Sequence, residues 1–143
     1  MKVVDANILL YAVNNQSFHH LKIKKWWEDL LNGDEGAALP WVCLLAFIRI
    51  STNPRVFSTP LRPADALATV DSWLNHPNVD VPREHDDHWE IFQALLANAG
   101  TAGNLSTDAH LAALAISHGA ILASCDSDFN RFQGLRLENP LQS

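Results

Sequence analysis

The sequence predicts an α/β fold in which helices cover both faces of a central, mostly parallel sheet. Short apolar runs with the composition of buried strands alternate with longer amphipathic segments. The resulting order is β-α-α-β-α-α-β-α-α-β with one further strand at the end, which is typical of layered α/β proteins. Acidic residues also follow two of the apolar runs, and open parallel sheets bind their ligands at that edge.

Apolar runs place the strands, and amphipathic periodicity places the helices. The predicted strands are residues 2–4, 36–39, 79–82, 120–123 and 135–140, the last at an edge of the sheet. The predicted helices are residues 19–32, 41–51, 62–75 and 86–99, with a further apolar helix that starts near Asp108 and stops at Gly119. Pro40 suits the first position of one helix. We expect Leu67 and Trp89 to be buried by the helices that contain them.

Length and composition favour one globular domain. The chain has 143 residues, of which 48% are apolar and 18% are charged. This profile is that of a folded protein with one core, so we expect residues 1–143 to form a single domain. No apolar run approaches the ~20 residues of a membrane span, and the N-terminus lacks the apolar segment of a secretory signal. We therefore expect a cytoplasmic protein.

The formal net charge of −6 argues against a protein that coats nucleic acid through a broad basic surface. The charge does not exclude a local nucleic-acid site, because an acidic cluster attracts phosphates once it has bound divalent cations. The two cysteines, Cys43 and Cys125, lie in apolar segments without the spacing of a metal site. We expect buried free thiols, and no base is placed beside Cys125 to make it a nucleophile.

Asp108 lies where the last apolar helix begins. Ser106 and Thr107 precede it, so a hydroxyl can cap the helix while Asp108 meets the positive end of the helix dipole. This structural role would suffice for Asp108 alone. A functional role gains weight from Asp5 and Asp126, because each follows an apolar run and parallel strands bring such residues to one edge of the sheet.

Converging carboxylates repel one another unless a cation lies between them. Oxygen ligands of this kind suit Mg²⁺ or Mn²⁺, and such an ion activates water and stabilises the oxygens of a phosphodiester displacement. The positions of Asp5, Asp108 and Asp126 therefore predict metal-dependent phosphodiester hydrolysis. A phosphatase with Asp5 as nucleophile is a weaker hypothesis, because the second acid expected two residues later is replaced by Asn7.

Two pairs of histidines invite a metal interpretation. His85 and His88 are three residues apart, so they can share a helical face. A zinc site needs three or four protein ligands, however, and the neighbouring acids suit a helix start. His110 and His118 suit the first turn and the end of the apolar helix, so we favour structural roles for all of them.

Several segments together resemble one known family. Residues 3–10, 107–115 and 122–129 are similar to the motifs of PIN-domain proteins of the VapC toxin type, and the resemblance extends to residues 47–57 and 135–141. It implies a PIN-like three-layer α/β/α fold. It further implies a Mg²⁺- or Mn²⁺-dependent ribonuclease of a type II toxin–antitoxin system. Such proteins are commonly homodimers, and a VapB-type antitoxin silences them by covering the active site with its C-terminal segment.

The same resemblance implies roles for individual residues. It assigns Asp5, Asp108 and Asp126 to catalysis and metal binding, with Asp128 as an accessory metal ligand. The residues that it assigns to supporting roles are Asn7 and Thr107, which orient the site, and Arg49, which lies near its rim.

One position departs from the family pattern. Ala46 stands where the family usually has a glutamate. Because this ligand is missing, the sequence leaves open whether the site binds one metal ion or two. An attenuated or inactive PIN-fold module, which binds RNA or the antitoxin without turnover, is therefore the alternative to the ribonuclease.

Overall fold

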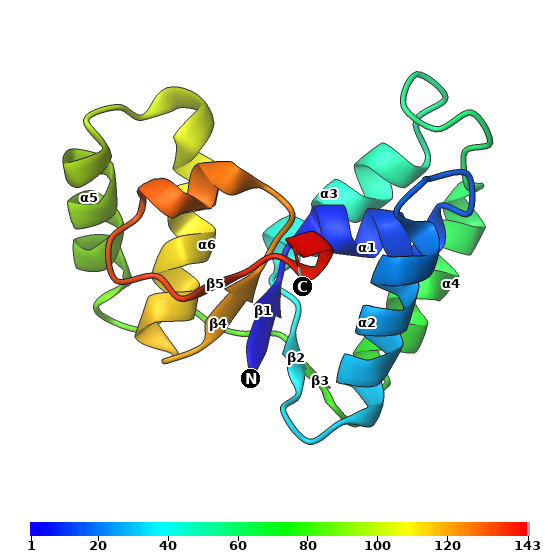
Figure 1. Ribbon diagram of the computed structural model, residues 1–143, viewed down its shortest axis with the longest axis horizontal. Coiled ribbons are helices and arrows are strands. Elements are labelled where there is room, and N and C mark those ends of the chain that lie inside the picture. The colour runs from blue at the N-terminus through cyan, green and yellow to red at the C-terminus, as the bar shows by residue number, and fades with distance from the viewer. Residues whose placement is uncertain (143) are drawn as a thin grey trace.

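The computed structural model describes residues 1–142, apart from the side chain of Asn104. Its centre is a sheet of five strands in the order β3-β2-β1-β4-β5, and every neighbouring pair is parallel (Figure 1). The strands are β1 (Lys2–Val4), β2 (Ala37–Ala38), β3 (Val79–Asp80), β4 (Ile121–Ala123) and β5 (Leu137–Glu138). The predicted α/β class and the predicted strand segments are thereby confirmed.

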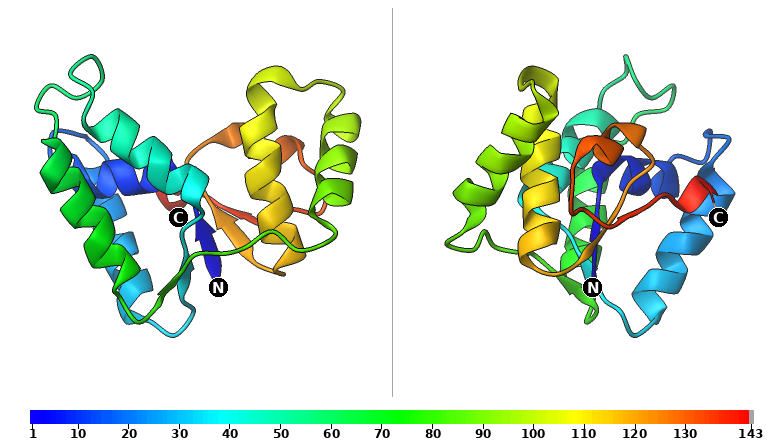
Figure 2. Two further views of the ribbon diagram at one scale, coloured as in Figure 1. Left: turned by 180° about the vertical axis from the view of Figure 1, so that it is seen from behind. Right: turned by 60° about the vertical axis from the view of Figure 1, so that its left-hand side comes forward.

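Helices flank the sheet on two sides. The helices are α1 (Ala6–Val13), α2 (His20–Asn32), α3 (Trp41–Ser51), α4 (Pro63–Leu74), α5 (His88–Ala99) and α6 (Ser106–Ser117). Helices α1 to α4 gather on one side of the sheet, and α5 and α6 lie on the other, as Figure 2 shows from two further directions. Short 3₁₀ helices are η1 (Gly103–Leu105), η2 (Ser127–Arg131) and η3 (Pro140–Gln142). None of the described helices is long and apolar enough to cross a membrane.

Successive strand residues point to opposite faces of the sheet and build two cores. Val3 and Leu122 belong to the core under α5 and α6. Val4 and Ala123 belong to the core under α1, α2 and α4. Because both faces are covered, the strand residues in the two cores are apolar, and the charged strand residues are Lys2, Asp80 and Glu138 at strand ends. Short apolar runs therefore sufficed to locate the strands.

Two side chains that we predicted to be buried are exposed, since Leu67 is 57% exposed and Trp89 is 64% exposed. The buried face of α4 consists of Ala66, Val70 and Trp73. Helix α5 packs on α6 at the periphery of the molecule, with Leu95 as its buried residue. Both errors arose because apolar side chains outnumber the positions that the one buried face of each helix offers.

The starts of two helices also differ from the prediction. Pro40 precedes α3 in an extended conformation, with φ −63° and ψ 147°, and is not its first helical residue. The residue that caps α6 is Leu105, and no side-chain hydrogen bond caps this helix in the described structure. The expected capping of α6 by the hydroxyl of Ser106 or Thr107 is therefore wrong, whereas Asp108 occupies the first turn as predicted.

Candidate active site

Asp5 is fixed by two elements at the carboxyl end of β1. Its backbone N–H donates to the carbonyl oxygen of Ala123 at 3.0 Å, which continues the pairing of β1 with β4. Its side chain caps α1, because Oδ1 accepts a hydrogen bond of 2.7 Å from the backbone N–H of Ala6. The sequence thus places a carboxylate at a strand end and uses the next helix to orient it.

Ser124 lies beside Asp5 and was missed as a site residue from the sequence. The β1–β4 register pairs Val4 with Ala123, so the next residues along the two strands are Asp5 and Ser124. The Ser124 hydroxyl is fully buried and donates to Asp5 Oδ2 at 2.8 Å. It also accepts from the backbone N–H of Asp126 at 3.0 Å, and so connects the Asp5 carboxylate to the backbone of Asp126.

Asn7 belongs to the same network. Its Nδ2 group donates to Asp5 Oδ2 at 3.3 Å and to the Ser124 hydroxyl at 3.2 Å. Its Oδ1 accepts from the backbone N–H of Cys125 at 3.3 Å. The structure therefore brings the predicted Asn7 into contact with Asp5, where it ties the start of α1 to the end of β4.

Three further carboxylates cluster next to Asp5. One oxygen from each of Asp108, Asp126 and Asp128 lies within 4.8 Å of the others. Asp108 comes from the first turn of α6, and Asp126 follows β4. Asp126 Oδ1 accepts a hydrogen bond of 2.9 Å from the backbone N–H of Asp128. This bond caps η2 and keeps Asp126 and Asp128 close together.

The acidic groups perturb one another. Burial raises the pKa of Asp108 to about 6, with further contributions from the negative charges of Asp126, Asp5 and Asp128. Burial also raises the pKa of Asp5, against the effect of the hydrogen bonds from Ser124 and Ala6. Asp5 lies outside the 4.8 Å group, but its charge still acts on Asp108 and is itself opposed by Asp126.

This donor set fits a divalent cation with a preference for hard oxygen ligands. Within residues 1–142, the ion pairs formed by lysine, arginine and histidine involve none of Asp5, Asp108, Asp126 and Asp128. Half-buried carboxylates without a positive partner repel one another, and a cation between them removes the repulsion. The cluster could therefore hold Mg²⁺ or Mn²⁺.

Helix α3 faces the same site without a carboxylate. The Cys43 sulfur is 4.0 Å from Asp5 Oδ1, and burial raises the pKa of this thiol well above its ordinary value. Ala46 follows three residues later and packs against the core that contains Cys43. The helix has no Asp or Glu over its length. A neutral thiol and a methyl group thus occupy the side from which the family's glutamate is expected.

The remaining predicted residues are not in contact with the carboxylates. Thr107 is exposed in the first turn of α6, next to Asp108. Arg49 is exposed in the last turn of α3. No hydrogen bond or ion pair joins either side chain to the carboxylates in the part of the chain that the structure describes.

The histidines connect α5 to α6. His88 Nε2 lies 3.0 Å from His110 Nδ1, and the rings of His85 and His118 have centroids 4.0 Å apart. Among the described residues, the metal-compatible groups of three or more side chains contain Asp108 and its partners but no histidine. The structure thus favours the structural role over a zinc site.

Comparison with known proteins identifies the family. The family model of the PIN domain matches residues 2–135. The chain belongs to the PIN-domain family. Ribonuclease VapC37 of Mycobacterium tuberculosis (strain ATCC 25618 / H37Rv) is 44% identical over 140 residues, which cover 98% of this chain and 97% of the relative. Ribonuclease VapC33 of the same strain is 42% identical over 142 residues, 99% of both chains. The resemblance to VapC proteins is confirmed.

A solved structure supports the same fold. The VapBC2 complex from Rickettsia felis, bound to a DNA fragment from its promoter, contains a chain that matches with a TM-score of 0.70 at 20% identity. The match covers 96% of this chain and 97% of the other. The PIN-like arrangement of a parallel sheet between helices, predicted from the sequence, is therefore confirmed for this VapC-family chain.

Proposed function

We propose that this VapC-family chain is a divalent-metal-dependent endoribonuclease and the toxin of a type II toxin–antitoxin system. The observation that carries the proposal is the cluster of carboxylates at the carboxyl edge of the sheet, which pairs with no lysine, arginine or histidine among residues 1–142. Curated relatives with 44% and 42% identity carry the name ribonuclease, which supports RNA as the substrate.

In this proposal, Asp5, Asp108 and Asp126 are the catalytic carboxylates and hold Mg²⁺ or Mn²⁺, with Asp128 as an accessory ligand. When bound, such an ion supplies the Lewis acidity that activates water and stabilises the phosphate oxygens. The protein itself orients the ligands. Ser124 holds Asp5 Oδ2 and the backbone of Asp126 at the same time, and the backbone N–H of Asp128 holds Asp126 Oδ1, so both carboxylates keep a fixed orientation.

Residues around the carboxylates have supporting roles in the proposal. Asn7 restrains Asp5 through a hydrogen bond of 3.3 Å. Thr107 precedes Asp108 at the start of α6 and is exposed, so its hydroxyl is free to meet solvent or substrate. Arg49 is exposed near the end of α3, where its charge is available to an RNA phosphate.

The proposal includes partners and a location. A VapB-type antitoxin would neutralise the toxin, and the match to a chain of the VapBC2 complex supports a fold that forms such a complex. The active form would be a homodimer, as the VapC resemblance implies. The cytoplasm, where RNA and a bacterial antitoxin meet, is the proposed location.

The α3 side of the site favours a second candidate function. Because Cys43 and Ala46 supply no oxygen ligand there, a PIN module that binds RNA or the antitoxin without turnover also fits the geometry. The two candidates share the fold and the acidic cluster. They differ in whether the carboxylates of the acidic cluster suffice for RNA hydrolysis without a ligand from α3.

Cleavage of RNA by purified, antitoxin-free protein decides between them. The assay follows a structured RNA on gels in Mg²⁺, in Mn²⁺ and in EDTA. The ribonuclease proposal expects metal-dependent cleavage that Asp5→Asn and Asp108→Asn remove. Undiminished cleavage by both variants would refute the assigned site. Metal-sensitive RNA binding without cleavage would establish the second candidate.

A further inference from the structure

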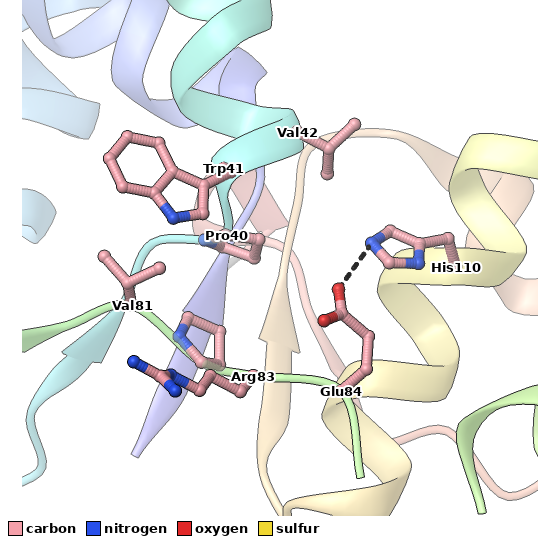
Figure 3. Close-up of a pocket in the computed structure, with 8 residues that line it drawn as sticks. Pro40, Trp41, Val42, Val81, Arg83, Glu84 and His110 are labelled. Atoms are coloured by element: carbon pink, nitrogen blue, oxygen red, sulfur yellow. Dashed lines mark ion pairs between the residues drawn. The ribbon is translucent and has the colours of Figure 1, made fainter. Parts of the chain in front are cut away.

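A cavity of about 280 Å³ lies at the carboxyl edge of the sheet, the same edge as the acidic cluster, and Figure 3 shows residues that line it. It is lined by the start of α3, by the segment that follows β3, and by His110 of α6. This volume is close to the lower end of the range for small-ligand pockets, which suits a group of about the size of one nucleobase. The proposed catalytic role of the carboxylates makes no use of this cavity.

The cavity adjoins the carboxylates through two helices. On α3, the lining residue Val42 precedes Cys43, whose sulfur is 4.0 Å from Asp5 Oδ1. On α6, the lining residue His110 comes two positions after Asp108. The cavity and the carboxylates therefore share two helices, and both lie at the carboxyl edge of the sheet.

An aromatic side chain stands at one side of the cavity. Trp41, the first residue of α3, is 57% exposed. No other ring of the described residues packs against its indole. Exposed aromatic rings beside a nucleic-acid path provide stacking platforms for unpaired bases, and this stacking tolerates any base because every base has a π-face.

A cation lies on the same side. The Arg83 side chain extends away from Glu84, towards the side where Trp41 stands (Figure 3). Its backbone is anchored, because His118 Nε2 donates to the Arg83 carbonyl oxygen at 2.7 Å. No carboxylate of the described chain pairs with its guanidinium. In a protein with a formal net charge of −6, such a free guanidinium is a specific place for a phosphate.

The opposite side of the cavity offers hydrogen-bonding groups. His110 Nε2 lies 3.7 Å from Glu84 Oε1, and both side chains point into the space in Figure 3. His110 Nδ1 already bonds His88 Nε2 at 3.0 Å, so the Glu84 carboxylate and His110 Nε2 are the groups that can recognise the edge of an unstacked base. Pro82 and Val81 supply further apolar lining, and Val81 lies on the side of Trp41 and Arg83 (Figure 3).

We propose that this cavity binds one unpaired nucleotide of an RNA strand, with the base stacked on Trp41, a phosphate on Arg83 and the base edge facing Glu84 and His110. The inference rests on the proposed function in that it assumes an RNA strand at the carboxylates. It adds a place for one nucleotide whose base is turned out of its stack, next to the proposed site of cleavage.

RNA binding by matched variants tests the proposal. The probe is a fluorescein-labelled, ten-nucleotide single-stranded RNA, followed by fluorescence anisotropy in Mg²⁺ with Asp108→Asn as the common, cleavage-deficient background. Trp41→Ala should weaken binding about tenfold, and Trp41→Phe should recover most of it, because a ring of either kind stacks on a base. Phe18→Ala, which removes a side chain that is 97% exposed in the α1–α2 connection, should leave binding unchanged.

The cation is tested through the salt dependence. For single strands, the slope of log K against log salt changes by about 0.7 for each phosphate contact, so Arg83→Gln should reduce the slope by about that amount. Arg136→Gln is the matched control, because Arg136 bonds the Gly119 carbonyl near the opposite edge of the sheet. With wild-type background and cleavable RNA, Trp41→Ala should raise KM about tenfold and change kcat less than about twofold.

Two outcomes would overturn the nucleotide site. One is equal RNA binding by Trp41→Ala and its parent. The other is a Trp41→Ala variant that binds RNA more weakly only because it no longer forms a dimer, as measured by sedimentation. Trp41 would then be a contact between two protein chains. These outcomes leave the ribonuclease proposal standing if RNA is still cleaved. Conversely, Trp41-dependent RNA binding by a wild-type protein that never cleaves RNA would refute the ribonuclease proposal and keep the nucleotide site.

Discussion

The two sides of the candidate active site differ in chemistry. The acidic wall, made of Asp5, Asp108, Asp126 and Asp128, supplies every carboxylate. The α3 wall, made of Cys43 and Ala46, supplies a neutral thiol and a methyl group. In the proposed function, metal binding therefore rests on the acidic wall, and the α3 wall shapes the site.

Removal of a charge from the acidic wall should have the largest effect. Asp5→Asn and Asp108→Asn each take one oxygen ligand from the proposed ion, so RNA cleavage should fall by more than about 100-fold, beyond the effect typical of outer-sphere changes. Single-turnover cleavage in saturating Mn²⁺ measures this loss. Asp29→Asn is the control, because that exposed residue pairs with Lys25 on α2 and should have no effect.

Removal of the support behind the acidic wall should have the next largest effect. Ser124→Ala deletes the buried hydroxyl that holds Asp5 and Asp126, so cleavage should fall on the order of tenfold. Urea unfolding should show a loss of about 1–3 kcal/mol, because polar partners stay buried without their hydrogen bonds. Ser51→Ala is a matched control: Ser51 is also fully buried, but its hydroxyl has no hydrogen-bond partner among the described residues. An equal loss in both variants would contradict the role of Ser124.

Addition of an acid to the α3 wall tests whether the walls can be made alike. Ala46→Glu places a carboxylate on the side that lacks one, so the affinity for Mn²⁺ should rise by roughly tenfold. Changes to the residues around a metal typically alter its affinity by at least this factor. Calorimetric titration measures the affinity, and the cleavage assay measures any gain in rate. Leu45→Glu, at the neighbouring exposed position on α3, should change neither. Unchanged affinity in Ala46→Glu would mean that α3 does not face the ion.

The pH dependence of stability should show the smallest effect. The folded-state pKa of Asp108 is about 6, above its ordinary value of 3.8, so the folded protein binds more protons than the unfolded chain between these values. In EDTA, this contribution to stability is therefore present below about pH 4 and is lost as the pH rises through about 6. Urea unfolding from pH 4 to 7 measures it. Asp108→Asn should flatten the dependence, and Mn²⁺ should oppose the loss by favouring the ionised form.

Much of the fold was predictable because its signals are local. Val3, Val4 and residues 120–123 are all apolar, which is the mark of strands buried on both faces, and they lie in or next to β1 and β4. The exposed positions Leu67 and Trp89 were predicted wrongly, because an apolar side chain on a helix does not reveal which face packs on a neighbour.

The acidic cluster was predictable to a similar extent. Strand ends and a helix start fixed the neighbourhood of Asp108 and Asp126, because parallel strands end at one edge. Ser124 was not predictable as a site residue, because its place beside Asp5 depends on the register of β1 against β4. The cavity beside Trp41 was not predictable either. It forms where three segments that are far apart in the sequence pack together, and no local sequence pattern indicates this packing.

Counting bound Mn²⁺ tests the central claim, that the acidic wall alone holds the ion required for RNA cleavage. Electron paramagnetic resonance of free Mn²⁺ during a titration gives the number of ions bound per chain, with cleavage measured on the same samples. The wild-type protein should bind about one ion per chain, since carboxylates from a single wall suit one hard cation. Asp108→Asn should lose the bound ion and the cleavage together. Cleavage in EDTA, or unchanged Mn²⁺ binding by Asp108→Asn, would contradict the account.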